Sequence, residues 1–176
     1  MVRESTSEEL KNYYENKHPD LNPDFIFAFP AYNFRNNEIG AIIGRNQLKR
    51  LDENNQLRNR NLELFLEHLD VEKYRTDFRL EGCCNYAFNL VLQRPDIPFT
   101  GRLMKKMREE KIEFRRGSSG GGNQLRQPYL RKILGDIYNN FPEVDYVHFY
   151  GFYIGNYPSL EEEKILKLCE ILNTVE

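Results

Sequence analysis

Cysteine is scarce in this chain of 176 residues, which has only the adjacent Cys83 and Cys84 and the distant Cys169. This spacing provides neither a ladder of disulfides nor the paired CxxC arrangement of a metal site. An apolar run near the roughly 20 residues that cross a bilayer is also missing, and the polar N-terminus does not resemble a signal peptide. We therefore expect a reduced, cytoplasmic protein with no metal site and no membrane partner.

The sequence has no large excess of charge of either sign. Lys and Arg total 25 against 27 Asp and Glu, a net charge of -2, so the chain lacks the basic field typical of proteins that bind nucleic acid. Local signatures of a self-sufficient active site are missing too, since there is no HExxH and the three histidines lie far apart. We expect no nucleic-acid partner, and we expect His18, His68 and His148 to be structural or exposed.

The hydrophobic pattern divides the chain into three segments, and the 40% of apolar residues are enough for one core. Residues 1–24 are polar and are predicted to be an arm or a truncated edge. Residues 25–70 contain an expected helix from Glu38 to Leu51 that is apolar on two sides, which suits a helix between two subunits or inside a larger core. A second helix follows with one apolar stripe, formed by Leu62, Phe65, Leu66 and Leu69.

Residues 71–176 are predicted to form a small α/β domain. Strands are expected over residues 86–92, 112–114 and 146–153, and helices over residues 100–110 and from Pro128 onward. Ser159 and Glu162 have the spacing of a capping box for a last helix, striped by Ile165, Leu168, Cys169 and Leu172. The order of elements indicates an α+β unit with a three-stranded, antiparallel or mixed sheet backed by helices.

Two segments have the residue types that bind an anion. The loop from Arg115 to Gln124 carries glycines at 120–122, which free backbone amides, and two arginines that can hold phosphate in bidentate contacts. It lacks the Gly-Lys-Ser/Thr ending of a nucleoside-triphosphate loop, and a surface loop without a ligand is the alternative. In the second segment, Asn33 and Arg35 share one face of an extended chain, although caps and solvated charge have the same pattern.

The run Phe29-Pro30-Ala31-Tyr32-Asn33-Phe34-Arg35, followed by Glu38-Ile39 and by IGRNQLKRLD at 43–52, resembles the DegT-type sugar aminotransferases. Their pattern is Gly-Tyr-Asn-x-Arg ahead of a helix that ends Gln-Leu-x-x-Leu, and Ala31 here replaces the usual glycine. Gly122-Asn123, Gln127-Pro128-Tyr129 and residues 153–160 resemble the subgroup that contains nucleotide-linked 4-keto-6-deoxysugar 3-dehydratases. Together the matches cover about residues 25–175.

The resemblance implies the dimer-contact helices and small C-terminal domain of a fold-type I enzyme that uses pyridoxal or pyridoxamine phosphate. In that family the cofactor lysine, or the histidine of the dehydratases, lies upstream of the motif. Catalytic residues are therefore expected to be absent here, and the isolated chain is expected to hold no cofactor. Asn33 and Arg35 would bind the cofactor phosphate of a neighbouring subunit. Residues 1–35 contain no cysteine, so an iron-sulfur cluster is not expected.

The same resemblance assigns the contacts with a nucleotide-diphosphate sugar to Arg116, Asn123 and Gln127. One function is then the C-terminal portion of an aminotransferase or dehydratase of deoxysugar and surface-polysaccharide biosynthesis, inactive until a homo-oligomer or a complementary N-terminal half completes it. A second is a non-enzymatic nucleotide-sugar-binding or interaction module. A third, a nucleic-acid-binding α+β domain, would use Arg115, Arg116 and Arg126, and the net charge counts against it.

Overall fold

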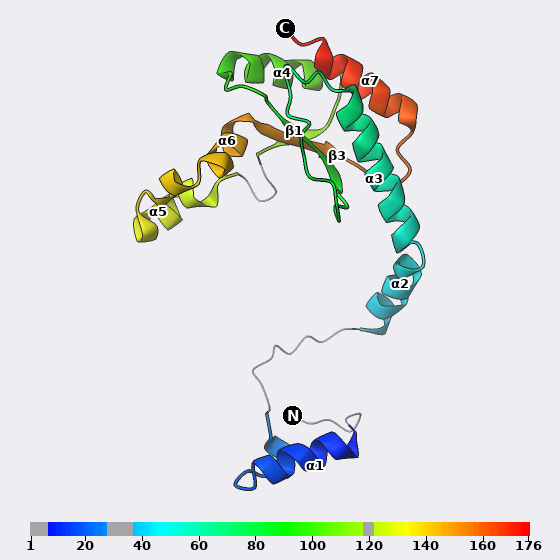
Figure 1. Cartoon of the computed structure of the whole chain (residues 1–176), viewed down its shortest axis with the longest axis vertical. Helices are drawn as coiled ribbons and strands as arrows, with labels where there is room; N and C mark the ends of the chain where they lie inside the picture. The colour runs from blue at the N-terminus through cyan, green and yellow to red at the C-terminus, as the bar shows by residue number, and fades with distance from the viewer. Residues whose placement is uncertain (1–6, 28–36, 118–121) are drawn as a thin grey trace. The chain divides into compact units, whose positions relative to one another are not determined.

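The computed structural model describes residues 7–27, 37–117 and 122–176. The chain divides into two compact units, Met1–Gly44 and Arg45–Glu176. The first contains α1 (Glu8–Lys17), the 3-10 helix η1 (Pro23–Phe25) and the start of α2 (Glu38–Leu48). The second continues with α3 (Leu51–His68), β1 (Ala87–Val91), α4 (Ile97–Glu109), β2 (Phe114–Arg116), η2 (Gln124–Arg126), α5 (Pro128–Leu134), η3 (Ile137–Asn140), α6 (Pro142–Tyr150), β3 (Gly151–Gly155) and α7 (Glu162–Asn173) (Figure 1).

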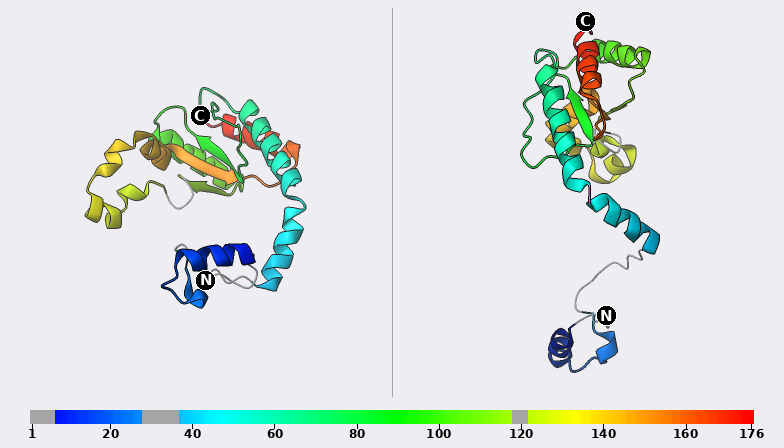
Figure 2. Two further views of the ribbon diagram at one scale, coloured as in Figure 1. Left: turned by 60° about the horizontal axis from the view of Figure 1, so that its bottom comes forward. Right: turned by 90° about the vertical axis from the view of Figure 1, so that its right-hand side faces the viewer.

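The sheet of the second unit has three strands in the order β1-β3-β2, and both pairings are antiparallel. Helices α3, α4 and α7 cover one face of this sheet (Figures 1 and 2). On that face Phe88 and Leu90 lie opposite Ile154 and Phe152, and all four side chains are buried. The α+β fold with a three-stranded sheet is therefore confirmed, and the sheet is the antiparallel one of the two expected kinds.

Helices α3 and α7 each bury the apolar stripe that their sequence predicts, and both stripes belong to the core. The ring of Phe65 on α3 stacks on Phe88 of β1 with centroids 4.4 Å apart. Each large apolar side chain fully buried in this way contributes about 1.5–3 kcal/mol to the free energy of unfolding. The buried Tyr74 connects the segment after α3 to α7, because its hydroxyl donates a hydrogen bond to the carbonyl oxygen of Leu172 over 2.8 Å.

The opposite face of the sheet carries a row of polar side chains. Asn89, Tyr153 and Arg115 occupy one register position on the three strands, so their side chains lie on the same face. Asn89 and Arg115 are exposed and Tyr153 is half-buried. On the same face of β1, Ala87 and Val91 are buried, so the open part of this face is the row at Asn89, Tyr153 and Arg115.

The strand predicted over residues 146–153 is wrong in its first half. Residues 142–150 form helix α6, and β3 occupies Gly151–Gly155. The aromatic and β-branched composition favoured a strand, but Pro142 at the helix start and Glu143 and Asp145 in the first turn favour a helix. Helix α6 therefore continues to Tyr150 and ends before Gly151.

Other element boundaries also differ from the prediction. The helix expected over residues 38–51 ends at Leu48, and α3 begins at Leu51. Helix α4 starts at Ile97 because the Asp96 side chain accepts the Phe99 N–H over 2.7 Å, and β2 covers residues 114–116. The capping box of Ser159 and Glu162 is absent, since α7 has Glu161 at its N-cap and no side-chain cap bond.

Helix α1 was not predicted, because it has no buried residue and hence no apolar stripe. Its start is instead set by Ser7, whose hydroxyl oxygen accepts the Leu10 N–H, and by two glutamates in the first turn. Capping and charge at the start of α1 therefore account for where it begins, and neither produces a hydrophobic period in the sequence.

The side chain of Asn156 connects three segments directly after β3. Its amide donates to the carbonyl oxygens of Arg58 over 2.9 Å and of Asn85 over 3.0 Å. Its oxygen accepts from the Asn61 amide over 3.1 Å, and Asn156 is only 2% exposed. One amide thus satisfies buried polar groups of α3 and of the segment that leads into β1, where water does not compete.

Replacing Asn156 by Ala should lower the free energy of unfolding by about 2–4 kcal/mol, because several buried partners lose their hydrogen bonds at once. Urea denaturation followed by circular dichroism measures the change. Asn89→Ala is the matched control on the open face of the sheet, where the cost should stay within about 0.5 kcal/mol. Equal effects of the two substitutions would show that the Asn156 contacts do not stabilise the fold.

Candidate functional site

Strand β2 brings two arginines to the start of the glycine-rich loop, on opposite faces of the sheet because neighbouring strand residues alternate. Arg115 lies beside Tyr153 on the open face, and its pKa is raised, first by a hydrogen bond with the Tyr153 side chain. Arg116 donates from Nη2 to the carbonyl oxygen of Phe149, at the end of α6, over 2.6 Å. The two guanidinium groups therefore point to different faces. They do not converge on one anion, although their adjacency in the sequence suggested that they could.

The described ends of the loop, Gly117 and Gly122, lie against each other and form what we call the loop neck. Both have positive φ, 69° and 85°, a region that favours glycine. A Cβ added to Gly117 would lie 3.1 Å from the Cα of Gly122. The N–H of Gly117 also donates to the carbonyl oxygen of Gly151 over 2.7 Å, which joins the neck to β3. Both glycines are thus required by backbone conformation and by close approach, since a Cβ added to Gly122 would lie 2.2 Å from Nδ1 of His148.

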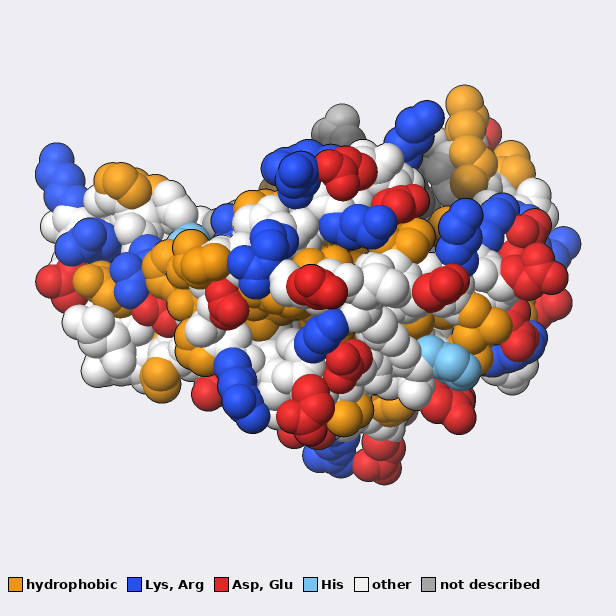
Figure 3. Space-filling model, turned by 90° about the horizontal axis from the view of Figure 1, so that it is seen from above, with side chains coloured by type: hydrophobic (Ala, Val, Ile, Leu, Met, Phe, Trp, Pro, Cys, Tyr) orange, Lys and Arg blue, Asp and Glu red, His pale blue; other side chains and the backbone are white. Residues whose placement is uncertain are grey.

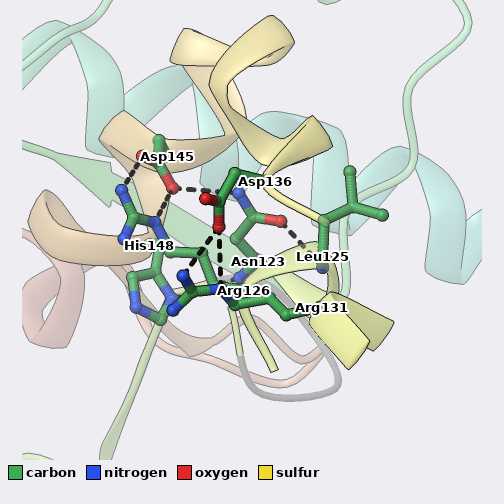
Figure 4. Close-up of polar contacts among 7 residues, drawn as sticks. All are labelled: Asn123, Leu125, Arg126, Arg131, Asp136, Asp145 and His148. Atoms are coloured by element: carbon green, nitrogen blue, oxygen red, sulfur yellow. Dashed lines mark hydrogen bonds and ion pairs between the residues drawn. The ribbon is translucent and has the colours of Figure 1, made fainter. Parts of the chain in front are cut away.

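Asn123 follows the neck and forms several hydrogen bonds with described residues of this region. It is only 1% exposed, and its oxygen accepts the Leu125 N–H over 3.1 Å, which caps η2. Its amide nitrogen donates to Oδ1 of Asp145 over 2.9 Å. Its backbone N–H donates to Nδ1 of His148 over 3.1 Å. The side chain is therefore directed into the protein, where it positions the chain after the loop (Figure 4).

Asp145 on α6 is the charged partner of this cluster. Arg126 donates to both of its carboxylate oxygens, from Nε and Nη2. The pKa of Asp145 lies below its ordinary value, first because of the hydrogen bond from Arg126, with a further contribution from Asn123. The guanidinium of Arg126 also lies 4.2 Å from the ring centroid of Tyr138. Arg126 is thus engaged within the chain rather than presented to a nucleic acid.

A separate cavity of about 580 Å³ opens at the other end of β2, where the strand begins. Its lining is apolar at Phe88, Phe114 and Leu168, and basic at Lys111 and Lys164. The volume is within the range of small-molecule sites. Its lining also includes Glu113 and Arg115, so the cavity reaches the first residue of the glycine loop.

The surface carries mixed charge, and acidic and basic side chains alternate on the face drawn in Figure 3. Within the described ranges no three or more His, Cys, Asp or Glu side chains gather in a way that could hold a metal ion. His68 contacts the carbonyl oxygen of Leu64 on its own helix over 2.9 Å. No helix in the part of the chain that the structure describes is long and apolar enough to cross a membrane.

The residues predicted to contact ligands lie in two places. Asn33 and Arg35 fall outside the residues that the structure describes. Arg116 is exposed at the edge of the loop, whereas Gln127 is half-buried and precedes Pro128 at the start of α5. Asn123 lies between them and faces inward, so its contribution is to hold the loop.

Sequence reasoning missed Asp145 and His148 as members of this cluster. Three residues apart on a helix, the two side chains share a face, whereas the same spacing on a strand places them on opposite faces. Because residues 146–153 were predicted as a strand, the pairing could not be anticipated. A helix start at Pro142 would have been the signal for it.

The sequence profile of the DegT/DnrJ/EryC1/StrS aminotransferase family matches residues 3–173. The chain belongs to this family. The resemblance seen in the sequence motifs is thereby confirmed, and it extends over the first unit as well as the second. Members of the family that use pyridoxal phosphate and act on sugars match this chain in their C-terminal part.

Three of the proteins that this chain is similar to are GDP-4-keto-6-deoxymannose 3-dehydratases. The GDP-4-keto-6-deoxy-D-mannose 3-dehydratase of Yersinia pseudotuberculosis is 29% identical over 150 residues, which are 84% of this chain and 38% of that protein. The E. coli enzyme of that name, solved with bound hydrated pyridoxal phosphate, superposes with a TM-score of 0.71 at 25% identity, over 85% of this chain and 39% of its own. A variant solved with bound GDP-perosamine gives a TM-score of 0.69 at 25% identity, with the same coverage. The chain thus spans about two fifths of these relatives.

Replacing Asp145 by Asn should lower the free energy of unfolding by about 1 kcal/mol at pH 7, because the charged bonds to Arg126 are lost. Since the pKa of Asp145 is depressed in the folded protein, its stabilisation is present above the ordinary aspartate pKa, about 3.9, and is lost as the pH falls through the folded value. The gap between wild type and variant should therefore persist from pH 7 to about pH 4 and shrink as the pH falls below about 3.9, as urea denaturation would show.

Asp136→Asn is the matched control for this measurement. Asp136 pairs with Arg131 over 2.7 Å, but the two side chains are 58% and 48% exposed, so the loss should stay below about 0.5 kcal/mol. A gap for Asp145→Asn that does not change with pH, or that equals the control at pH 7, would contradict the role assigned to Asp145.

Proposed function

We propose that this chain is the C-terminal portion of a nucleotide-sugar aminotransferase or dehydratase that depends on pyridoxal or pyridoxamine phosphate. The proposed setting is the synthesis of deoxysugars and surface polysaccharides. The observation that carries the proposal is the family match over residues 3–173, together with relatives that act on a GDP-linked sugar and are only about two fifths covered. We further propose that the chain is inactive until the large N-terminal domain of such an enzyme is supplied.

The cofactor would be held only in part by this chain. The amide of Asn33 and the guanidinium of Arg35 are donors of the kind that bind phosphate, and we assign them to the cofactor phosphate of a neighbouring subunit. When bound, the cofactor supplies an electron sink for bonds at the sugar carbon that reacts. Among the described lysines, Lys73 does not fit an attachment role, because its ammonium donates to the carbonyl oxygens of Asn173 and Val175 over 2.6 and 2.9 Å.

Helix α2 supports the proposal of a partner subunit or a complementary N-terminal half. Ile39, Ile42 and Ile43 on this helix are exposed, and Ile39 reaches 73%. Contiguous apolar side chains at a surface mark contacts with another protein surface. We assign α2 to the interface that brings Asn33 and Arg35 to the cofactor of the other subunit.

The glycine loop is the proposed contact for the diphosphate of the sugar nucleotide. Arg116 is its exposed cation, and the neck and Asn123 hold the backbone on either side of residues 118–121. Glycines leave backbone N–H groups accessible to an anion. One or two charged hydrogen bonds would support roughly millimolar affinity, so the isolated chain should bind weakly.

Titration with GDP-mannose, followed by backbone amide signals, tests this assignment. Shifts should concentrate between Arg116 and Gln127, and Arg116→Ala should weaken binding by about tenfold through the loss of a charged contact. Arg115→Ala is the matched control, because that side chain lies on the other face and its loss should change affinity by less than about twofold. Shifts centred on Lys111 to Arg115 and Lys164, with a silent loop, would place the ligand in the separate cavity and contradict the proposal.

A further inference from the structure

The segment between Asn123 and β3 is a part of the second unit that stays outside the core. None of residues 124–150, all of which the structure describes, is buried, whereas Asn123 and Gly151 on either side are. Helix α5 stands apart from the three strands in both views (Figures 1 and 2), and its Ile133 is 76% exposed. The apolar burial that stabilises the rest of the unit is therefore missing here.

Both ends of this segment are nevertheless attached to the rest of the unit. At one end the Asn123 amide donates to Oδ1 of Asp145 on α6 over 2.9 Å. At the other end α6 is attached next to β1, because the Tyr146 hydroxyl donates to the carbonyl oxygen of Leu92 over 2.9 Å. Between the two attachments lie η2, α5 and η3, and we call residues 124–140 the α5 segment.

The helices of the α5 segment are too short to persist in water without tertiary contacts. Helix α5 has seven residues, and η2 and η3 have three and four. Isolated helices shorter than about 12–15 residues are marginal even in favourable sequences. Opening of a region also requires little free energy where few apolar groups are buried. The segment therefore depends on a contact that holds it against α6.

Arg126 supplies such a contact. Its guanidinium donates from Nε and Nη2 to both carboxylate oxygens of Asp145, and bidentate charged pairs are among the strong hydrogen bonds of proteins (Figure 4). The same group lies 5.2 Å from the ring centroid of Phe149 on α6 and 4.2 Å from that of Tyr138 on η3. Arg126 thus joins η2 and η3 to a helix that is itself attached next to β1.

We propose that the α5 segment opens and closes as one unit while α6 and the sheet remain folded, and that the ion pair between Arg126 and Asp145 is the latch that keeps it closed. Opening breaks this pair and leaves the hydrogen bonds of Asn156 intact, because those bonds join α3 to the residues that flank β1 and β3. Gln127 lies in the segment, so the latch also determines when this residue occupies the place seen here. The inference goes beyond the proposed function and does not depend on it, since opening requires no ligand.

Amide hydrogen exchange of the full chain at pH 7, followed residue by residue by NMR, separates opening of the segment from global unfolding. The amides of Arg131 and Gly135, which donate within the segment over 3.0 and 2.9 Å, report on the segment, and those of β1 and β3 report on the core. In Asp145→Asn the segment amides should exchange about fivefold faster, because a charged bidentate contact is lost. Arg126→Gln removes the pair from the other side and should have the same effect, so either variant that folds provides the test.

Two substitutions are controls for this measurement. Asn156→Ala weakens the core without touching the segment, so it should accelerate exchange of the β1 and β3 amides by at least about tenfold and of the segment amides by less than about twofold. Asp136→Asn removes an exposed ion pair within the segment and should change the segment exchange by less than about twofold. Low concentrations of urea should accelerate the core amides more steeply than the segment amides, because global unfolding exposes more surface.

Several results would overturn the proposal. Equal acceleration of segment and core amides in Asn156→Ala would show that the segment opens only when the whole unit unfolds. Unchanged segment exchange in a folded Asp145→Asn or Arg126→Gln variant would show that the ion pair is not the latch. Segment amides that exchange as in an unfolded chain in wild type would show that no closed state exists. Protection of the segment that rises with protein concentration would assign its closure to a second copy of the chain instead.

Discussion

The direct junction of helix α6 with strand β3 is the constraint on which the second unit depends. The helix ends at Tyr150 and the strand begins at Gly151, with no connecting residue. A Cβ at Gly151 would lie 2.6 Å from the carbonyl oxygen of Val147, so glycine is what allows so sharp a change of direction. Because β3 is the central strand and pairs with both neighbours, this junction also fixes where α6 presents Asp145 and His148 to the end of β2.

The second unit buries its own apolar core, whereas apolar side chains of α2 are exposed. Leu62, Phe65 and Leu172 are buried against the sheet, and the Asn156 amide donates to the carbonyl oxygens of Arg58 and Asn85. Ile39 and Ile42 of α2 are exposed instead. This contrast is what a portion of a larger family enzyme would show, in which a small domain closes on itself and a contact helix requires another surface. It agrees with relatives of which the chain spans 38% to 39%.

Hydrophobic periodicity predicted the elements that bury an apolar stripe. It failed for α6, where local signals at the start of the helix determine the structure. The stripes of α3 and α7 and the alternation in β1 gave the fold class, because burial leaves a period in the sequence. Helix α6 was predicted as a strand, since its composition favoured one and its helix signals are local ones at Pro142 and Glu143. That error concealed that Asp145 and His148 share one face of α6, from which both contact Asn123. The predicted ligand contacts of Arg116 and Asn123 stay predictions, and the inward direction of Asn123 depends on tertiary contacts that no local pattern contains.

We propose that the residue that anchors the cofactor belongs to the large N-terminal domain of such an enzyme and not to this chain. The most direct measurement incubates the isolated chain with pyridoxal phosphate, reduces the mixture with borohydride and locates any modified lysine by mass spectrometry. We expect no lysine labelled to stoichiometry, because Lys73 donates to the carbonyl oxygens of Asn173 and Val175 and because the resemblance implies that the cofactor residue precedes the motif at residues 29–35. Complete labelling of one specific lysine would contradict it and would show that the chain contains a cofactor site of its own.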